Sequence, residues 1–318
     1  MEMPTYWQLL QLILPIFAII GAGVALRRIG WLNKEADESL LKIVVKFLYP
    51  CLILDSVLGN AALRVPANLF VPPMVAFATI SVGMGLAWWV ARTLGMQRGT
   101  GLRTFAFTTG IFNYAYIPIP LMAALYGRDS LGVLLVYNVG CEAAIWTVGI
   151  LLLAGLSLRD GWRQLLNPPV WALLVGIGIN EMGLAPRVPT FLLMSVSLCA
   201  KCAIPLGLIL IGATLEEFIR ENPMSLADPK VTPAACVLRM GVLPIAFLLL
   251  TRFLPVTPEL KRVMIVQASM PAGILSIVIA KHYGGRAQTA AQVVVATNLL
   301  ALVAIPLWLR LGLSWLGP

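Results

Sequence analysis

Residues 112–120 read Phe-Asn-Tyr-Ala-Tyr-Ile-Pro-Ile-Pro and stand at the centre of an apolar stretch, 103–126, that is long enough to cross a lipid bilayer. Pro118 and Pro120 each remove a backbone hydrogen-bond donor and push the preceding residue toward extended geometry, so an α-helix cannot run smoothly through this stretch. Non-helical backbone at membrane depth is tolerated only where it is buried in protein or lines a wet cavity. We therefore expect a broken membrane-spanning helix, with a binding site at the break.

A second break is expected at residues 267–273, Gln-Ala-Ser-Met-Pro-Ala-Gly, in the corresponding place of the second half of the chain. Two further landmarks recur between the halves: a Lys-x-x-x-Pro motif at 46–50 and 201–205, and a Tyr-Gly pair at 126–127 and 283–284. Their offsets are 155 and 157 residues. With five spans in each half, the second half would enter the membrane in the opposite orientation. Inverted repeats of this kind are typical of secondary transporters.

The composition indicates a protein that lies in a lipid bilayer. Hydrophobic residues make up 59% of the chain and charged residues 12%, with a mean hydropathy of +0.89, whereas soluble domains contain about a quarter charged residues. The alternating pattern of a membrane barrel is absent from the sequence, so we expect an all-α integral membrane protein. Ten spans are expected, at 7–26, 40–58, 70–91, 103–126, 130–156, 169–186, 190–215, 232–254, 260–283 and 288–316.

The expected organisation is a first five-helix repeat at 1–156, a cytoplasmic linker at 157–168 and a second five-helix repeat at 169–318. Twelve loop lysines and arginines fall in the odd-numbered loops and seven on the opposite side. This distribution predicts that both termini lie outside. The expected location is the bacterial inner membrane, which the chain would cross several times. The loop that contains Arg252 and Lys261 argues for the reverse orientation.

Other classes of function find little support in the sequence. The net charge of +9 does not indicate nucleic-acid binding, because no basic run with interleaved aromatic residues occurs. We expect no metal and no cofactor, since the Cys199 and Cys202 pair has CxxC spacing but lies mid-helix without a second pair. An enzyme is not expected, because HExxH and GxSxG motifs are missing and His282 is the single histidine.

The half-helix after each break would point its free N–H groups and the positive end of its dipole at the membrane midplane, which suits an anion. The residues expected to bind that anion come from the two breaks and from the last span: Asn113, Tyr114, Pro118, Pro120, Gln267, Ser269, Met270, Pro271 and Asn298. The alternative is a pair of proline kinks that serve packing alone. Single serines in membrane helices, moreover, usually bond back to their own backbone.

Four side chains within the spans are candidates for coupling or for a counter-charge: Glu142, Asn138, Lys46 and Lys201. Glu142 and Asn138 are four residues apart and so share a helix face. Glu142 is the first candidate for coupling to a proton or cation, the alternative being a structural ion pair with a lysine or with Arg239. The two lysines are expected to flank the translocation path and draw anions from either face, or else to snorkel toward the interface.

These motifs resemble those of the auxin efflux carrier family of bacterial and plant membrane transporters, which is related in fold to the bile-acid/sodium symporters. The resemblance covers essentially the whole chain. It rests on Asn113, Pro120-Leu121 and Tyr126-Gly127, on Ile211-Gly-Ala-Thr-Leu215, and on Met270-Pro-Ala272 with Tyr283-Gly284. Two features depart from the family pattern: Pro118 stands where a glycine is usual, and the long cytosolic loop of the plant members is missing.

The resemblance implies ten helices in which the broken helices four and nine cross. Helices three to five and eight to ten would move as an elevator against a scaffold of helices one, two, six and seven. It also implies a homodimer, and cargo such as auxin or malate- and malonate-type carboxylates. We therefore expect a secondary active transporter of a small organic anion, driven by a proton or sodium gradient. A sodium-coupled symporter of a larger amphipathic anion and an anion channel are the alternatives.

Overall fold

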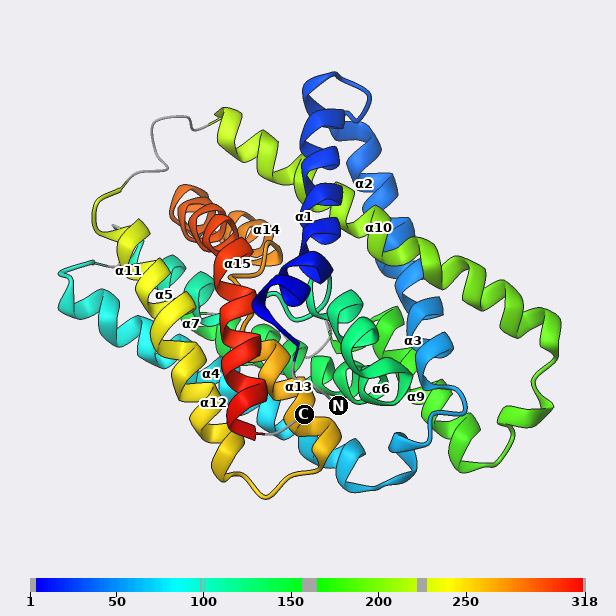
Figure 1. Ribbon diagram of the computed structural model, residues 1–318. Coiled ribbons are helices and arrows are strands. Elements are labelled where there is room, and N and C mark those ends of the chain that lie inside the picture. The colour runs from blue at the N-terminus through cyan, green and yellow to red at the C-terminus, as the bar shows by residue number, and fades with distance from the viewer. Residues whose placement is uncertain (1–3, 98, 100, 156–164, 222–227, 317–318) are drawn as a thin grey trace.

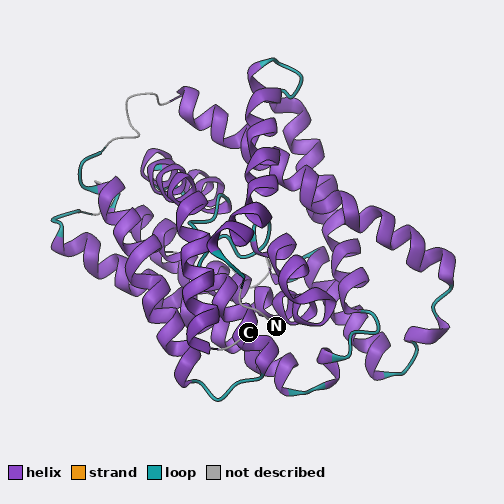
Figure 2. Ribbon diagram, in the orientation of Figure 1, coloured by secondary structure: helices purple, strands orange, loops and turns teal. Residues whose placement is uncertain are grey.

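The computed structural model describes residues 4–97, 99, 101–155, 165–221 and 228–316. These residues form helices joined by short loops, and their β-structure is confined to one isolated bridge (Figure 2). The prediction of an all-α protein is confirmed. Six helical runs are long enough and apolar enough to cross a membrane: Tyr6–Arg28, Ala67–Thr93, Pro118–Ala154, Thr190–Arg220, Val231–Phe253 and Ala287–Trp315.

The helices follow one another along the chain with few long connections (Figure 1). Their bounds are α1 (Tyr6–Arg28), α2 (Lys34–Ile43), α3 (Tyr49–Val57), α4 (Ala67–Thr93), α5 (Leu102–Gly110), α6 (Pro118–Ala144), α7 (Ile150–Ala154), α9 (Pro168–Glu181), α10 (Thr190–Glu221), α11 (Val231–Val237), α12 (Leu243–Phe253), α13 (Pro258–Ala268), α14 (Leu275–His282) and α15 (Ala287–Leu316). The π-helical turns η1 (Val44–Leu48), η4 (Ile145–Gly149) and η7 (Leu238–Val242) join α2 to α3, α6 to α7 and α11 to α12.

Both predicted helix breaks are present. The expected span at 103–126 is divided, because α5 ends at Gly110 and α6 begins at Pro118. The expected span at 260–283 is divided in the same way between α13 and α14. The proline at the start of α6 occupies the first helical turn, where a missing N–H removes no hydrogen bond from the helix.

The long run that begins with α6 contains a sharp turn at Gly127, whose φ of +69° is a conformation that residues with a Cβ rarely adopt. This turn falls between the expected spans at 103–126 and 130–156. The expected linker at 157–168 lies mostly outside the described residues. Its last residue, Pro168, is the first residue of α9. The count of ten spans and the inverted arrangement of the two halves stay predictions.

The helices pack in two groups. In the first group α1 crosses α10 in close contact, and α3 packs against α10 and α9 (Figure 1). Glycines allow the close approach of α1 and α10: a Cβ at Gly23 would lie 2.1 Å from the Ile209 carbonyl oxygen, and one at Gly212 would lie 2.0 Å from that of Ile20. In the second group α4 packs against α5 and α6, α6 against α13, and α15 against α5 and α11.

Three ion pairs tie the ends of α1, α2 and α10 together. They join Arg27 to Asp37, Arg28 to Glu216 at 2.9 Å, and Lys34 to Glu217 at 2.7 Å. The first group of helices is therefore held together by close backbone packing where α1 crosses α10 and by ion pairs near the ends of α1, α2 and α10.

Candidate functional site

The two helix breaks meet and pair through their backbones. The Asn113 N–H donates to the Pro271 carbonyl oxygen at 2.8 Å, and the Gly273 N–H donates to that of Ile111 at 3.0 Å. These two bonds make an antiparallel bridge between Phe112 and Ala272. Glycine suits position 273 because an added Cβ would lie only 3.0 Å from the Phe112 oxygen. We call the paired segments, residues 111–117 and 269–274, the crossover.

Helix α15 supplies the hydrogen bonds that the crossover backbone lacks. Thr297 Oγ1 accepts from the Ala272 N–H at 3.2 Å, and Asn298 Nδ2 donates to the Ala272 carbonyl oxygen at 3.0 Å. Both side chains are buried, and both also bond carbonyl oxygens of their own helix. Unpaired backbone groups are costly inside a protein, so these two residues stabilise the non-helical segment. Asn298, expected at the site from the sequence, lies at the crossover.

A chain of side-chain amides leads from the crossover to α3. Gln267 Nε2 donates to the Tyr114 carbonyl oxygen at 3.1 Å and lies 3.4 Å from Asn138 Oδ1. Asn138 Nδ2 in turn donates to the Tyr49 hydroxyl at 3.4 Å. The Gln267 Oε1 atom is buried and has no hydrogen-bond partner among the described residues. Tyr49 was not expected from the sequence, because a tyrosine in an apolar span carries no signal of its own.

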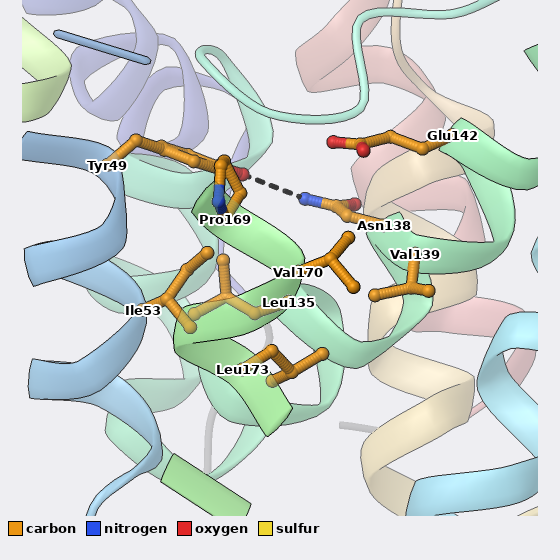
Figure 3. Close-up of a pocket in the computed structure, with 9 residues that line it drawn as sticks. All are labelled: Tyr49, Ile53, Leu135, Asn138, Val139, Glu142, Pro169, Val170 and Leu173. Atoms are coloured by element: carbon orange, nitrogen blue, oxygen red, sulfur yellow. Dashed lines mark hydrogen bonds between the residues drawn. The ribbon is translucent and has the colours of Figure 1, made fainter. Parts of the chain in front are cut away.

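Glu142 and Asn138 both reach a small pocket between α3, α6 and α9 (Figure 3). Apart from Tyr49 its other walls are apolar, and its volume of about 10 Å³ leaves room for about one water molecule. The Glu142 carboxylate accepts a hydrogen bond from Asn167 Nδ2 at 2.6 Å. Asn167 also caps α9, because its Oδ1 accepts from the Val170 N–H at 3.0 Å. Glu142 thus connects α6 to the N-cap of α9.

The ion pair of Glu142 with a lysine or with Arg239, an alternative from the sequence, is not formed among the described residues. Arg239 is instead fully buried beside the crossover. Its guanidinium carbon lies 5.2 Å from the ring centre of Phe112 and 5.6 Å from that of Phe247. The sequence marks Arg239 as a charge within an apolar span, but it was expected only as a possible partner of Glu142 and not beside the crossover.

The other expected site residues differ in what they offer. Tyr114 is partly exposed and contributes its backbone oxygen, whereas Met270 is fully buried in the core. Ser269 Oγ donates to the Ile265 carbonyl oxygen at 3.0 Å, as the alternative from the sequence anticipated. Pro118, Pro120 and Pro271 shape the backbone.

The two lysines of the expected translocation path have exposed side chains. Lys46 lies in the π-helical turn η1 and Lys201 lies in α10. Pro50, four residues after Lys46, has no N–H to offer the Lys46 carbonyl. Exposure fits both expectations from the sequence, since a path-lining lysine and a snorkelling lysine each keep the ammonium group outside the packed core.

The chain matches the model of a protein family described as "Membrane transport protein" over residues 8–159 and 156–309. An uncharacterized transporter of Methanothermobacter thermautotrophicus is 26% identical over 304 residues, which cover 94% of this chain and 96% of that protein. Uncharacterized transporter MJ1031 of Methanocaldococcus jannaschii is 20% identical over 308 residues, which cover 94% and 97%. Because the family model covers nearly the whole sequence, the chain belongs to the membrane transport protein family, the auxin efflux carrier family that its motifs resemble.

Proposed function

We propose that the protein is a secondary active transporter of a small organic anion such as a carboxylate, with its binding site at the crossover. The observation that carries this proposal is the backbone bridge between Phe112 and Ala272. It brings together two non-helical segments that are each followed by the start of a helix, α6 at Pro118 and α14 at Leu275. A helix N-terminus carries a partial positive charge, which favours an anion. At α6 this is an effect of the helix dipole, because Pro118 and Pro120 have no N–H and the Ile119 N–H donates to the Ala115 carbonyl oxygen.

An elevator mechanism fits the two groups of helices. We assign α1, α2, α3, α9 and α10 to a static scaffold and the remaining helices to a moving core, within ten spans that form two inverted repeats. The contacts between the groups include the rings of Tyr49 and Tyr116, whose centres are 6.5 Å apart, and the hydrogen bond from Asn167 to Glu142. They also include the packing of α1 on α15. In this mechanism such contacts break and re-form as the core moves.

Glu142 is our candidate for the coupling residue. Its carboxylate accepts from Asn167 across the boundary between core and scaffold. A charged acceptor makes a stronger hydrogen bond than a neutral one, so protonation of Glu142 would weaken this link and favour separation of α6 from α9. Binding of a proton and movement of the core would then be linked. From the loop charges we place both termini outside, in a bacterial inner membrane.

The proposal is tested with purified protein in liposomes. Uptake of labelled malonate, malate, indole-3-acetate and a bile acid is followed under imposed proton and sodium gradients. We expect one anion to accumulate under one gradient, Asn113→Ala to lose that accumulation, and the control Asn33→Ser to keep it. Serine preserves the helix cap that Asn33 provides to α2. Movement of anions only down their own gradient contradicts coupled transport. Normal accumulation by Asn113→Ala contradicts a site at the crossover.

A further inference from the structure

Arg239 is a buried cation in direct contact with the crossover. Its side chain is 0% exposed, and its guanidinium group faces Phe112, the residue that pairs with Ala272. Phe247 provides a second ring beside it, and the two phenylalanine rings contact each other edge to face at 6.3 Å between centres. Cation–π attraction between the aromatic rings and the face of the guanidinium group holds that group in place.

The donors at the edge of this guanidinium group are unused. Its three nitrogen atoms are buried and have no hydrogen-bond partner among the described residues. The tyrosine in electrostatic range, Tyr137, shares a hydrogen bond with Thr79 at 2.9 Å and carries no charge as a phenol. Arginine keeps its proton under physiological conditions, so a positive charge with free donors lies in the protein interior.

The helices around Arg239 offer no counter-charge. The turn η7 that contains Arg239 packs against α5, α11, α12 and α15. The sequences of these four helices contain no aspartate and no glutamate. An unpaired buried charge is costly, and charged residues inside membranes usually mark the path of a substrate or ion. These four helices therefore leave Arg239 without a counter-charge.

The backbone carbonyl of Met240, next to Arg239, has a hydrogen-bond partner, in contrast to the Arg239 side chain. Pro244 has no N–H to offer the Met240 carbonyl oxygen, and Trp308 Nε1 from α15 donates to that oxygen instead at 2.7 Å. The π-helical turn is thus stabilised by a specific tertiary hydrogen bond, and turns of this kind are frequent at functional sites. The free donors are therefore those of the Arg239 side chain, while the neighbouring Met240 carbonyl oxygen is satisfied.

We propose that Arg239 is the counter-charge for a carboxylate group of the cargo. Two parallel N–H donors of the guanidinium group bind the two carboxylate oxygens when the crossover opens, in the geometry that arginine and carboxylates prefer. Phe112 and Phe247 fix the plane of the guanidinium group and so orient this pair. The inference rests on the proposed function and narrows it: the cargo carries at least one carboxylate, and the neutral amide of the same compound is discriminated against.

The test compares acids with their amides. Binding of malonate, malonamide, indole-3-acetate and indole-3-acetamide to purified protein is measured alongside uptake in liposomes, for wild type, Arg239→Gln and Arg239→Lys. The control is Arg262→Gln, which removes the same charge from an arginine that also stacks on an aromatic ring. The Arg262 guanidinium carbon lies 5.3 Å from the centre of the Tyr126 ring. We expect Arg239→Gln to weaken binding of the transported acid about 10- to 100-fold and to leave amide binding unchanged. Arg239→Lys keeps the positive charge but lacks the two parallel N–H donors, so it should weaken binding of the acid less than Arg239→Gln does.

Three results would overturn the inference. If Arg239→Gln binds and transports the acid as wild type does, Arg239 is not the counter-charge, although the proposed function stands. If Arg239→Gln weakens acid and amide binding equally and also has a lower melting temperature without ligand, the role of Arg239 is structural. If wild-type protein transports none of the anions, the proposed function fails and the inference fails with it. Should Arg239→Gln not fold, the ratio of acid to amide binding in Arg239→Lys decides the question.

Discussion

The ring of Tyr116 lies against the backbone of Gly207, so closely that a Cβ at position 207 would be 2.0 Å from the Tyr116 Cε1 atom. Tyr116 belongs to the crossover and Gly207 to α10, which packs along α1. The contact therefore joins the candidate binding site to the proposed scaffold at a point where any side chain larger than glycine would displace the ring.

Gly207→Ala is expected to slow transport by about tenfold while the protein still folds. The added methyl group forces Tyr116 out of its place, and overpacking of this kind typically costs about 1–3 kcal/mol. The clash occurs only in conformations in which Tyr116 lies against Gly207. It therefore destabilises the conformation of this structure and raises the population of conformations in which the two residues are apart. Initial rates of anion uptake in liposomes measure the effect.

The matched control for this prediction is Gly178→Ala in α9, where an added Cβ has no atom within 4 Å. Both substitutions exchange the same residues in helices of the proposed scaffold, so they change helix propensity alike. Equal transport rates in the two variants would mean that the contact of Tyr116 with Gly207 does not matter for the transport cycle.

Thr297→Val is expected to lower both the melting temperature and the transport rate. Valine has nearly the same shape, but it leaves the buried Ala272 N–H without the acceptor that Thr297 provides. An unsatisfied buried donor costs about 1–3 kcal/mol. The control is Thr251→Val, which removes a buried hydroxyl that bonds only the Phe247 carbonyl of its own helix. Similar melting temperatures for the two variants would show that α15 does not stabilise the crossover through Thr297.

The sequence allowed the two helix breaks to be predicted, because proline acts locally on the backbone around it. It also indicated that Asn138 and Glu142 share a face, since helical spacing alone determines this. The crossing of the two breaks was implied by the resemblance to the family, not by any local pattern. The backbone hydrogen bonds that pair residues 111–113 with 271–273 were not predicted, because they depend on how distant helices pack.

The partners of the charged residues were also beyond local reasoning. The Glu142 carboxylate could have paired with a lysine or with Arg239, and in the structure it accepts from Asn167, the N-cap of α9. Arg239 faces aromatic rings instead. Asn167 lies 25 residues from Glu142, and Phe112 belongs to a segment far from Arg239 in the sequence. Residue type therefore limited the possible partners without selecting among them.

Glu142→Gln is expected to abolish proton-driven accumulation of the cargo and to leave exchange of labelled for unlabelled cargo intact. Glutamine keeps the shape of the side chain and an acceptor oxygen for Asn167, but it binds no proton at physiological pH. The dependence of wild-type uptake on a proton gradient should therefore disappear in the variant. Accumulation and exchange assays in the same liposomes separate the two activities.

Glu38→Gln serves as the control for loss of a carboxylate. Glu38 lies before the expected span at 40–58, and its hydrogen bond with Lys42 at 2.7 Å lowers the pKa of this exposed carboxyl. It is ionised throughout the physiological range and is not expected to exchange protons during transport. If Glu142→Gln accumulates cargo under a proton gradient as well as Glu38→Gln does, Glu142 is not the proton-coupling residue.

Lys46→Met and Lys201→Met are each expected to lower the uptake efficiency, kcat/KM, for an anion by about tenfold at low salt, because a positive charge near the path raises the local anion concentration. Salt screens such attraction, so the difference from wild type should shrink as ionic strength rises. Methionine preserves the length of the side chain and its apolar stem, which isolates the role of the charge. Lys281→Met is the control, since Lys281 is also exposed and lies in the last turn of α14. If the three variants transport equally well at low salt, Lys46 and Lys201 only snorkel, and the anion is guided by the crossover alone.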